Sequence, residues 1–513
     1  SSTSRGLGDV YKRQKLNKSI LKAVAAISLT LALTGCTDEF FDVNENPNSP
    51  SMSTPKLSLP VAQQELLALN ARPMTYLGNY MMYNWSKPSN WQANIAETAY
   101  TVNANFYSGI FEGSYLDVFK NLVYLENYTD NTGVVDYSIY KGISTILKAY
   151  QYQYLVDLYG DVPYTEANQR GGNTTPKYDK AEDIYKDNIN RLTEVVATLN
   201  TIPTNGEKPG SQDIIFKGDL TKWQQFANTI KLRYLVRLSN TGQDSYIKSE
   251  IAKILANGKG FITADVKGNP GYVDNANKMN PFYDYFRVAG TAAETSRSQY
   301  TVATDYTIDY LKATNDPRIA RLYAPSKKKA EFKGVWQALS LPGTGYTSDD
   351  LSKVGPGLIK SPTQDQPLML YSEALLLQAE AAQRGYLSDN AEALYKKAIE
   401  QSFVFLGVPD AVASAQTYYS QNLPNVNFAS SPNKIMAIMQ QKWIALNGTS
   451  SIELWIEHNR TGYGAGIPIP ADAGRTTRPY RLLYPSSEVA RNSANVPAQT
   501  IEDAFNKKIF WQK

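Results

Sequence analysis

Cysteine and histidine are almost absent from this 513-residue chain, which contains one of each, Cys36 and His458. A single cysteine cannot form an internal disulfide, and the Cys and His clusters that usually hold zinc cannot be built. A lone histidine near the end of an expected helix is more often structural than catalytic. Neither a G-x-S-x-G motif nor a phosphate-binding glycine loop with its lysine is present. We therefore expect no metal and no cofactor.

A surplus of positive charge is also lacking once the N-terminal segment is set aside. The whole chain has a formal net charge of +4. Residues 1–35 contain six basic residues and one acidic residue, so the rest of the chain is close to −1. A nucleic-acid-binding protein needs a basic face, which this chain has little excess charge to build. We expect no nucleic-acid partner.

Long apolar runs are scarce, and the one near the N-terminus is short. Residues 23–35 form an apolar run of 13 residues behind a basic head, whereas a membrane-spanning helix needs about 20. A basic head, a short apolar run and small residues are typical of a secretory signal. The sequence LTGC at 33–36 resembles the bacterial lipobox, which implies cleavage before Cys36 and lipidation of that residue. The alternative is a buried free cysteine at the edge of a core helix.

The first 60 residues are expected to be processed or to act as a tether. Residues 1–14 precede the basic head and lack a start methionine, so we interpret them as a non-native scar. Residues 15–35 are predicted to be a lipoprotein signal peptide. Residues 36–60, rich in Asn, Ser and Pro, are predicted to be a lipidated tether. We expect residues 61–513 to form a single binding domain.

Helical periodicity dominates that domain. Apolar residues between Ile143 and Leu158 form one stripe, which Gly160 is placed to end. Similar periods predict helical repeats over about 61–260 and 367–450. The stretch 261–366 has no sustained period and is too long for a plain loop. We expect it to be a large loop-rich insertion containing short helices and hairpins.

The helix pairs carry a partial repeat signature. Ala391, Tyr395 and Ala398 have the spacing of the second helix of a tetratricopeptide repeat, and Ala181 with Tyr185 repeats part of it. Small residues at such positions let helices approach closely. The predicted fold class is therefore mostly α, with tetratricopeptide-like helix pairs forming a right-handed superhelical scaffold.

Six segments stand out in order along the chain: NENPNSP, YLVDLYGDVPYTEA, ANTIKLRYLVRLS, NDPRIARLYAP, SEALLLQAEAAQRG and IMQQKWIALNG. Together they resemble the SusD/RagB-like (SusD-like) nutrient-binding outer-membrane lipoproteins. The similarity runs over nearly the whole chain after the signal. One departure is EHNRTGY at 457–463, where family members often carry paired basic residues before Thr-Gly, so we assign no binding role there.

The resemblance implies a function and partners. Family members sit on the cell surface in the outer membrane and form a lid on a TonB-dependent (SusC-like) transporter. They capture oligosaccharides or peptides and are not enzymes. The only contact with the membrane would be through the lipid on Cys36. Two alternatives remain: a surface glycoside hydrolase that uses an Asp/Glu pair, and a helical-repeat scaffold that binds only protein.

A sugar-binding site without charge needs aromatic rings, because the C–H face of a sugar stacks on Trp or Tyr while amides at the rim bind its hydroxyls. The densest such mixture lies between residues 79 and 109. Pro88 predicts a turn that brings two tryptophans to the surface as a stacking floor. The alternative is that several of these aromatic residues belong to the core. The predicted ligand-binding residues are Trp85, Trp91, Tyr100 and Tyr107 with Asn84 and Asn90, and from a second segment Tyr283, Tyr285 and Arg287.

Overall fold

Helices supply most of the regular structure in the computed structural model, which describes residues 53–338 and 346–512. Helix accounts for 49% of the described residues and strand for 5%, so the predicted mostly α fold class is confirmed. Residues Pro55–Lys513 form one compact unit. Cys36 and the predicted signal peptide lie outside the described residues. No described helix is long and apolar enough to cross a membrane.

The first helices form one long, nearly continuous segment. Helix α2 (Pro55–Leu69) passes through a π-helical turn, η2 (Asn70–Met74), into α3 (Thr75–Met81). The predicted tether is therefore too long at its C-terminal end, because Pro55 fits the first turn of a helix and Leu59 is already buried. Helices α5 (Gly109–Gly113) and α6 (Lys120–Asn127) are joined by the π-helical η3 (Ser114–Phe119). Both η3 and α6 pack against α2, and α5 contacts η2.

Four helices follow that pack mainly on their neighbours in the sequence. They are α7 (Ser138–Tyr159), α8 (Ala181–Thr198), α9 (Leu220–Arg237) and α10 (Asp244–Ala256). Helix α7 ends at Gly160 as predicted, and the φ of +82° at that residue favours glycine. Two-residue strands β2 (Val162–Pro163) and β3 (Tyr178–Asp179) pair between α7 and α8.

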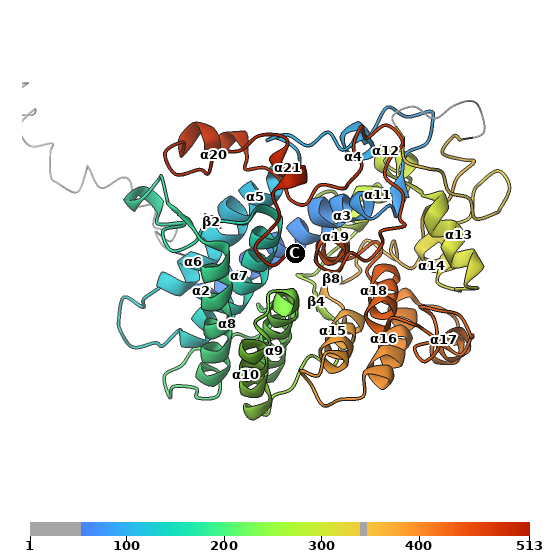
Figure 1. Ribbon diagram of the computed structural model, residues 1–513. Coiled ribbons are helices and arrows are strands. Elements are labelled where there is room, and N and C mark those ends of the chain that lie inside the picture. The colour runs from blue at the N-terminus through green and yellow to red at the C-terminus, as the bar shows by residue number, and fades with distance from the viewer. Residues whose placement is uncertain (1–52, 339–345, 513) are drawn as a thin grey trace, which may run out of the picture. The chain divides into compact units, whose positions relative to one another are not determined.

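The second helical group begins at α15 (Tyr371–Gln383) and α16 (Ala391–Leu406), which pack as a pair. Tyr395 and Ala398 of the repeat signature are buried, as are Ala181 and Tyr185. The group continues with α17 (Ala411–Tyr419), α18 (Lys434–Ala445) and α19 (Ser451–Thr461). Helix α19 packs against both α3 and α18 and lies between the two helical groups (Figure 1).

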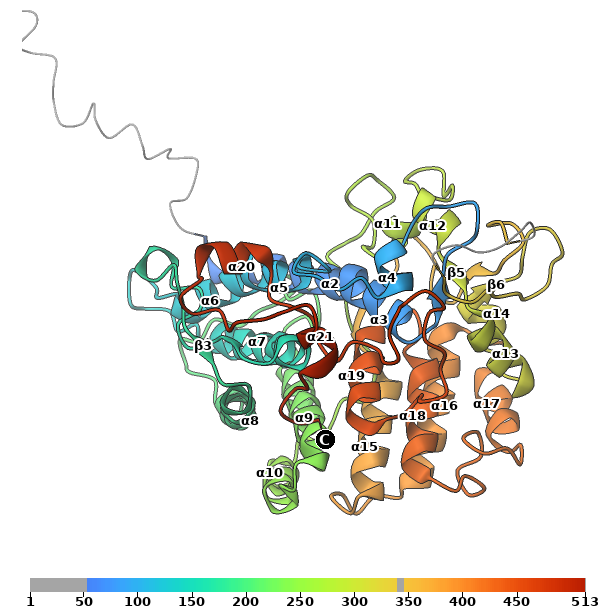
Figure 2. The ribbon, with the colours of Figure 1, turned by 45° about the horizontal axis from the view of Figure 1, so that its top comes forward.

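The predicted insertion 261–366 contains short elements, as expected. Its helices are α11 (Tyr283–Phe286), α12 (Ser296–Tyr300), α13 (Asp305–Ala313) and α14 (Ile319–Leu322). One sheet has the order β1-β5-β7-β6, formed by Trp85–Ser86, Val302–Ala303, Lys353–Val354 and Tyr323–Ala324. Strand β4 (Val266–Gly268) pairs antiparallel with β8 (Gln366–Met369). Helices α4 (Ile95–Ala99), α11 and α12 gather at one end of this unit (Figure 2).

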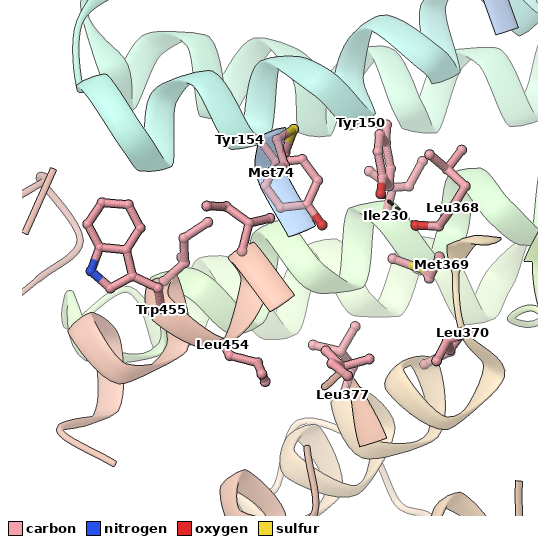
Figure 3. Packing of buried hydrophobic residues seen from close by; sticks show 14 of the residues in the cluster. Met74, Tyr150, Tyr154, Ile230, Leu368, Met369, Leu370, Leu377, Leu454 and Trp455 are labelled. Atoms are coloured by element: carbon pink, nitrogen blue, oxygen red, sulfur yellow. Dashed lines mark hydrogen bonds between the residues drawn. The ribbon is translucent and has the colours of Figure 1, made fainter. Parts of the chain in front are cut away.

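The hydrophobic core joins the two helical groups. Figure 3 shows side chains from η2, α7, α9, β8, α15 and α19 meeting around Tyr150 and Tyr154. The hydroxyl of Tyr150 donates a 2.7 Å hydrogen bond to the carbonyl oxygen of Leu368, so a buried polar group is satisfied by the strand. Burial of these side chains is the main force that holds the groups together.

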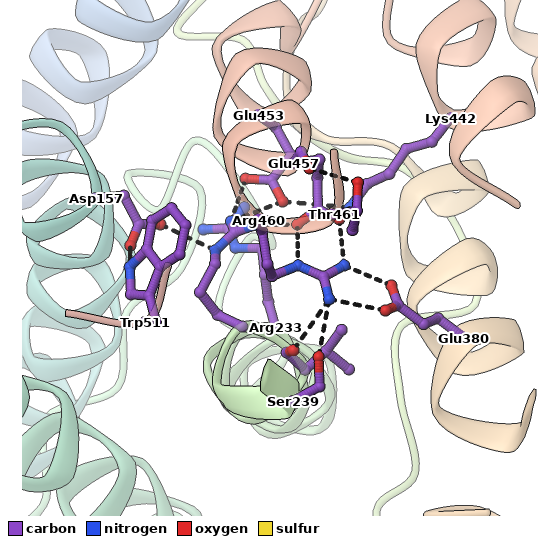
Figure 4. Close-up of polar contacts among 12 residues, drawn as sticks. Asp157, Arg233, Ser239, Glu380, Lys442, Glu453, Glu457, Arg460, Thr461 and Trp511 are labelled. Atoms are coloured by element: carbon purple, nitrogen blue, oxygen red, sulfur yellow. Dashed lines mark hydrogen bonds and ion pairs between the residues drawn. The ribbon is translucent and has the colours of Figure 1, made fainter. Parts of the chain in front are cut away.

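A buried ion network also crosses this junction (Figure 4). Arg237 on α9 contacts Glu453 at 2.7 Å and Glu457 on α19, and Asp157 on α7 at 3.2 Å. Arg460 binds both carboxylate oxygens of one partner on α15, at 2.8 and 2.7 Å. Every charge has a partner, which burial requires. The members, each at most 3% exposed, are Asp157, Arg233, Arg237, Glu373, Glu380, Lys442, Glu453, Glu457 and Arg460.

Candidate ligand-binding site

Trp85 does not lie at the surface. Its side chain is fully buried, with ring centres 5.4 Å from Tyr76 and 6.0 Å from Phe286. Strand β1 pairs with β5 at this residue, which fixes the backbone and places the ring in the core. The predicted stacking floor of two tryptophans is therefore wrong for Trp85.

Three other predicted site residues are also buried. The amide of Asn84 donates to Asn79 at 3.2 Å and is fully enclosed. Tyr100 is 3% exposed and Tyr283 is 7% exposed. Neighbouring side chains enclose these three residues and leave no accessible surface for a ligand. The prediction that they are accessible is therefore wrong.

The remaining predicted residues reach the surface. Trp91 is half-buried, and Asn90 is exposed and accepts a 3.1 Å hydrogen bond from the backbone of Ser348. The half-buried Tyr107 donates to Glu97 at 2.8 Å. Tyr285 is half-buried on α11. Arg287 is half-buried too, but its guanidinium is held within its own segment, as described below.

Two accessible residues missed in the sequence complete the site. The ring of Tyr300 meets that of Trp91 edge to face, with centres 5.6 Å apart. The guanidinium carbon of Arg297 lies 4.2 Å from the ring centre of Tyr285 and 5.8 Å from that of Tyr300. We call Trp91, Tyr285, Arg297 and Tyr300 the aromatic–arginine cluster. The sequence around these two residues has no helical period, so no local pattern placed Arg297 and Tyr300 together.

Tyr76 of α3 lies beneath this cluster. The guanidinium of Arg297 is 4.7 Å from its ring centre. The hydroxyl of Tyr76 forms a 2.8 Å hydrogen bond with the hydroxyl of Thr301. Burial raises the pKa of Tyr76 to about 12, so it stays neutral at physiological pH. A buried tyrosine thus provides a fixed base for the accessible side chains.

Local hydrogen bonds hold α11 and α12 in place. Thr295 caps α12 by accepting from Ser298, and its hydroxyl donates to the carbonyl of Tyr285 at 2.6 Å. Arg287 donates to the hydroxyl of Ser298 at 2.9 Å and to the carbonyl of the preceding residue. These contacts link the two helices and so fix the positions of Tyr285, Arg297 and Tyr300 relative to one another.

A salt bridge secures the other side of α11. Arg72 of η2 donates to Asp284 at 2.8 Å and to the carbonyl of Pro281 at 3.0 Å. The guanidinium carbon of Arg72 also lies 5.3 Å from the ring centre of Tyr285. Tyr285 is therefore contacted by two arginines: Arg72, which is paired with Asp284, and Arg297, which has no hydrogen bond or ion pair with the described residues.

Two surface cavities lie away from the cluster. One, of about 320 Å³, lies beside β8 and is lined by Phe282, Leu358 and Phe405 among others. Another, of about 510 Å³, is lined by Tyr164, Arg191 and several carboxylates. Neither includes a predicted ligand-binding residue.

The described residues show no arrangement typical of a metal centre. Within 53–338 and 346–512, no group of three or more His, Cys, Asp or Glu side chains is placed to hold a metal ion. His458, at the end of α19, contacts the carbonyl oxygen of Tyr463 through Nδ1. Burial lowers the pKa of His458 to about 4, so the ring is neutral and structural in this setting.

The protein is thus a helical-repeat scaffold that presents an aromatic cluster on short inserted helices and an adjoining loop. Comparison with protein families identifies the class more closely. Residues 47–485 match the SusD-like family described as "Starch-binding associating with outer membrane". The chain belongs to this family, whose members are associated with the outer membrane. None of the curated proteins matches the chain in sequence.

Solved structures share the whole fold. A SusD/RagB family protein from Bacteroides thetaiotaomicron aligns with a TM-score of 0.73 at 20% identity, over 90% of this chain and 99% of its own. A chitin-binding protein aligns with a TM-score of 0.71 at 25% identity, over 90% of this chain and all of its own. A chitin-binding SusD homolog from Flavobacterium johnsoniae gives 0.71 at 23% identity, over 89% and 98%.

Proposed function

We propose that this protein captures oligosaccharides at the cell surface and passes them to a TonB-dependent, SusC-like transporter. The observation that carries the proposal is the aromatic–arginine cluster, presented on the scaffold of a carbohydrate-binding family. Rings of Trp91 and Tyr300 offer apolar faces for sugar rings, and Asn90 lies near Trp91 in the sequence. Two similar proteins named as chitin-binding support a glycan over a peptide.

The anchor belongs to the same proposal. Cleavage before Cys36 and lipidation of its sulfur and amino group would hold the protein in the outer membrane, because several acyl chains anchor stably. Mass spectrometry of membrane-extracted protein should find acyl mass on an N-terminal Cys36 peptide. Cys36→Ser should release the protein in folded form. An unmodified thiol on a membrane-bound protein would refute the anchor.

We further propose that the protein is non-catalytic. The glycoside hydrolase alternative needs two carboxylates flanking a bound sugar. Beside the cluster, Asp284 is committed to Arg72 and Glu97 accepts from Tyr107. A protein that binds an oligosaccharide without hydrolysing it would exclude the glycoside hydrolase alternative. A protein that binds no glycan but retains its protein partners would favour the protein-binding scaffold.

The decisive experiment combines glycan binding with partner recovery. Calorimetry should detect an oligosaccharide that binds wild-type protein and is lost in Trp91→Ala. Tyr246→Ala removes a half-buried ring from α10, which lies well apart from α12 in Figures 1 and 2, and serves as a control for protein quality. Gentle purification from native membranes should recover a large β-barrel protein. Recovery of this chain alone would refute the transporter partnership.

A further inference from the structure

Arg297 has an unused set of hydrogen-bond donors. Within residues 53–338 and 346–512, its guanidinium forms no hydrogen bond and no ion pair, although it contacts three tyrosine rings. A guanidinium carries five N–H donors in a planar fork. The rings fix the plane of this fork, so little side-chain freedom remains to be lost when a ligand binds.

The surrounding polar atoms are donors as well. In the described part of the chain, the indole N–H of Trp91 and the hydroxyls of Tyr285 and Tyr300 have no hydrogen-bond partner, and none is a buried atom. The hydroxyls can donate or accept, whereas the indole and the guanidinium only donate. This surface is therefore rich in donors that point to an acceptor-rich ligand.

The acidic side chains around the cluster already have partners. Asp284 accepts from Arg72 at 2.8 Å, and Glu97 accepts from Tyr107 at 2.8 Å. Neither contacts Arg297 within 4 Å as an ion pair. The positive charge of Arg297 is thus half-buried among aromatic rings without a counter-charge from the described residues, an arrangement that a bound anion would stabilise.

We propose that the aromatic–arginine cluster selects oligosaccharides that carry carboxylates, that is, uronic acid units. The inference rests on the proposed glycan-binding function and names its substrate class. A sugar ring stacks on Trp91 or Tyr300, and its carboxylate accepts two parallel hydrogen bonds from Arg297. Paired, charge-assisted bonds of this kind are stronger than bonds to neutral hydroxyls and read the planar shape of a carboxylate.

The competing explanation is that Arg297 only clamps the tyrosines. Cation–π contacts alone would stabilise α11 and α12 and would not distinguish charged from neutral sugars. Arg287 and Arg72 show what a structural arginine looks like here, because their guanidinium groups bind carbonyl, hydroxyl or carboxylate oxygens of the protein. Arg297 makes none of these contacts with residues 53–338 and 346–512.

Calorimetry on the full protein tests the inference with defined probes. Tetrasaccharides of galacturonate, mannuronate and glucuronate are compared with the methyl-esterified galacturonate tetramer and with chitotetraose, which are neutral. We expect at least one uronate to bind ten-fold or more tightly than the neutral probes, and its affinity to fall as salt rises. Arg297→Met should abolish that preference, and Arg297→Lys should retain only part of it because ammonium lacks the fork.

The control is Arg491→Met, which removes one positive charge from the exposed end of α20 (Ser486–Arg491), well apart from α12 in Figures 1 and 2. It should leave the preference unchanged. Equal binding of the galacturonate tetramer and its methyl ester, or a preference unchanged in Arg297→Met, would overturn the inference. Binding of chitotetraose alone, lost in Trp91→Ala, would overturn it while leaving the proposed function intact. Binding of no probe would count against both.

Discussion

Arg237→Met should remove the central cation of the buried ion network and strongly destabilise the protein. The guanidinium faces Asp157, Glu453 and Glu457, and all four side chains are at most 2% exposed. Deleting one member of a buried pair leaves an uncompensated charge, at a cost of about 3–5 kcal/mol. For a unit of this length, roughly 1 kcal/mol corresponds to one degree, so Tm should fall by about 3–5 °C at pH 7.5.

The pH dependence gives the prediction a sharper test. Burial raises the pKa of Asp157 to about 6, although Arg237 opposes that shift. Burial would also raise the pKa of Glu453, but Arg237 and Lys442 hold it at about 2. The stabilisation from Glu453 is therefore present above its unfolded-state pKa of about 4.5 and is lost as pH falls towards 2. Without Arg237, both carboxylates take up protons more readily, so the cost of the substitution should shrink between pH 7.5 and pH 5.

Urea denaturation and thermal melts at both pH values measure this cost. Arg191→Met is the matched control, because its pair with Asp187 is exposed and should contribute less than about 1 kcal/mol. Arg237→Lys should lie between wild type and Arg237→Met, since one ammonium cannot reach three carboxylates. A loss below about 1 kcal/mol for Arg237→Met, or a loss that is independent of pH, would refute the reasoning.

Three further predictions concern single positions. Trp85→Ala should cost about 3–5 kcal/mol of stability, whereas Trp91→Ala should leave Tm nearly unchanged; comparable losses in thermal melts would contradict the assignment of core and surface. Gly78→Ala should destabilise the protein by about 1–3 kcal/mol or more, because an added Cβ would lie 2.1 Å from the backbone of α19. Gly109→Ala should be tolerated, because nothing lies within 4 Å of its added Cβ. Equal melting temperatures of the two variants would show that α3 and α19 separate freely. Burial lowers the pKa of His458 to about 4, so the contribution of the neutral ring to stability is present above pH 6.5 and is lost as pH falls through 4. His458→Gln should flatten the dependence of Tm on pH over that range. An unchanged pH dependence would show that the ring is not buried in solution.

The helices could be predicted from the sequence because their signals are local. The apolar stripe of α7 and its stop at Gly160 need only the residues of that segment. The helix now seen as α9 was also expected, but its buried charges were not. Arg233 and Arg237 have the sequence pattern of a solvated face, and their burial depends on carboxylates 140 to 220 residues away.

The candidate site was predicted only in part for a similar reason. Composition found the aromatic segment and Trp91, but it could not separate Trp91 from Trp85, since the difference arises from pairing of β1 with β5. Arg297 lies in a polar stretch without helical period. Its surroundings come from α3, where the hydroxyl of Tyr76 meets Thr301 across 225 residues. Contacts of that range leave no local pattern.

The buried ion network also constrains when the polypeptide can fold during its synthesis. Asp157 and Arg237 are made early, whereas Glu453 and Glu457 emerge from the ribosome some 220 residues after Arg237. Until they arrive, burying Arg237 in an apolar interior would carry a heavy penalty, so the growing N-terminal half keeps that charge in water. The native junction forms only when the chain is nearly complete. Completion of the core is therefore deferred to the last stage of synthesis, when α19 becomes available to pair with α9.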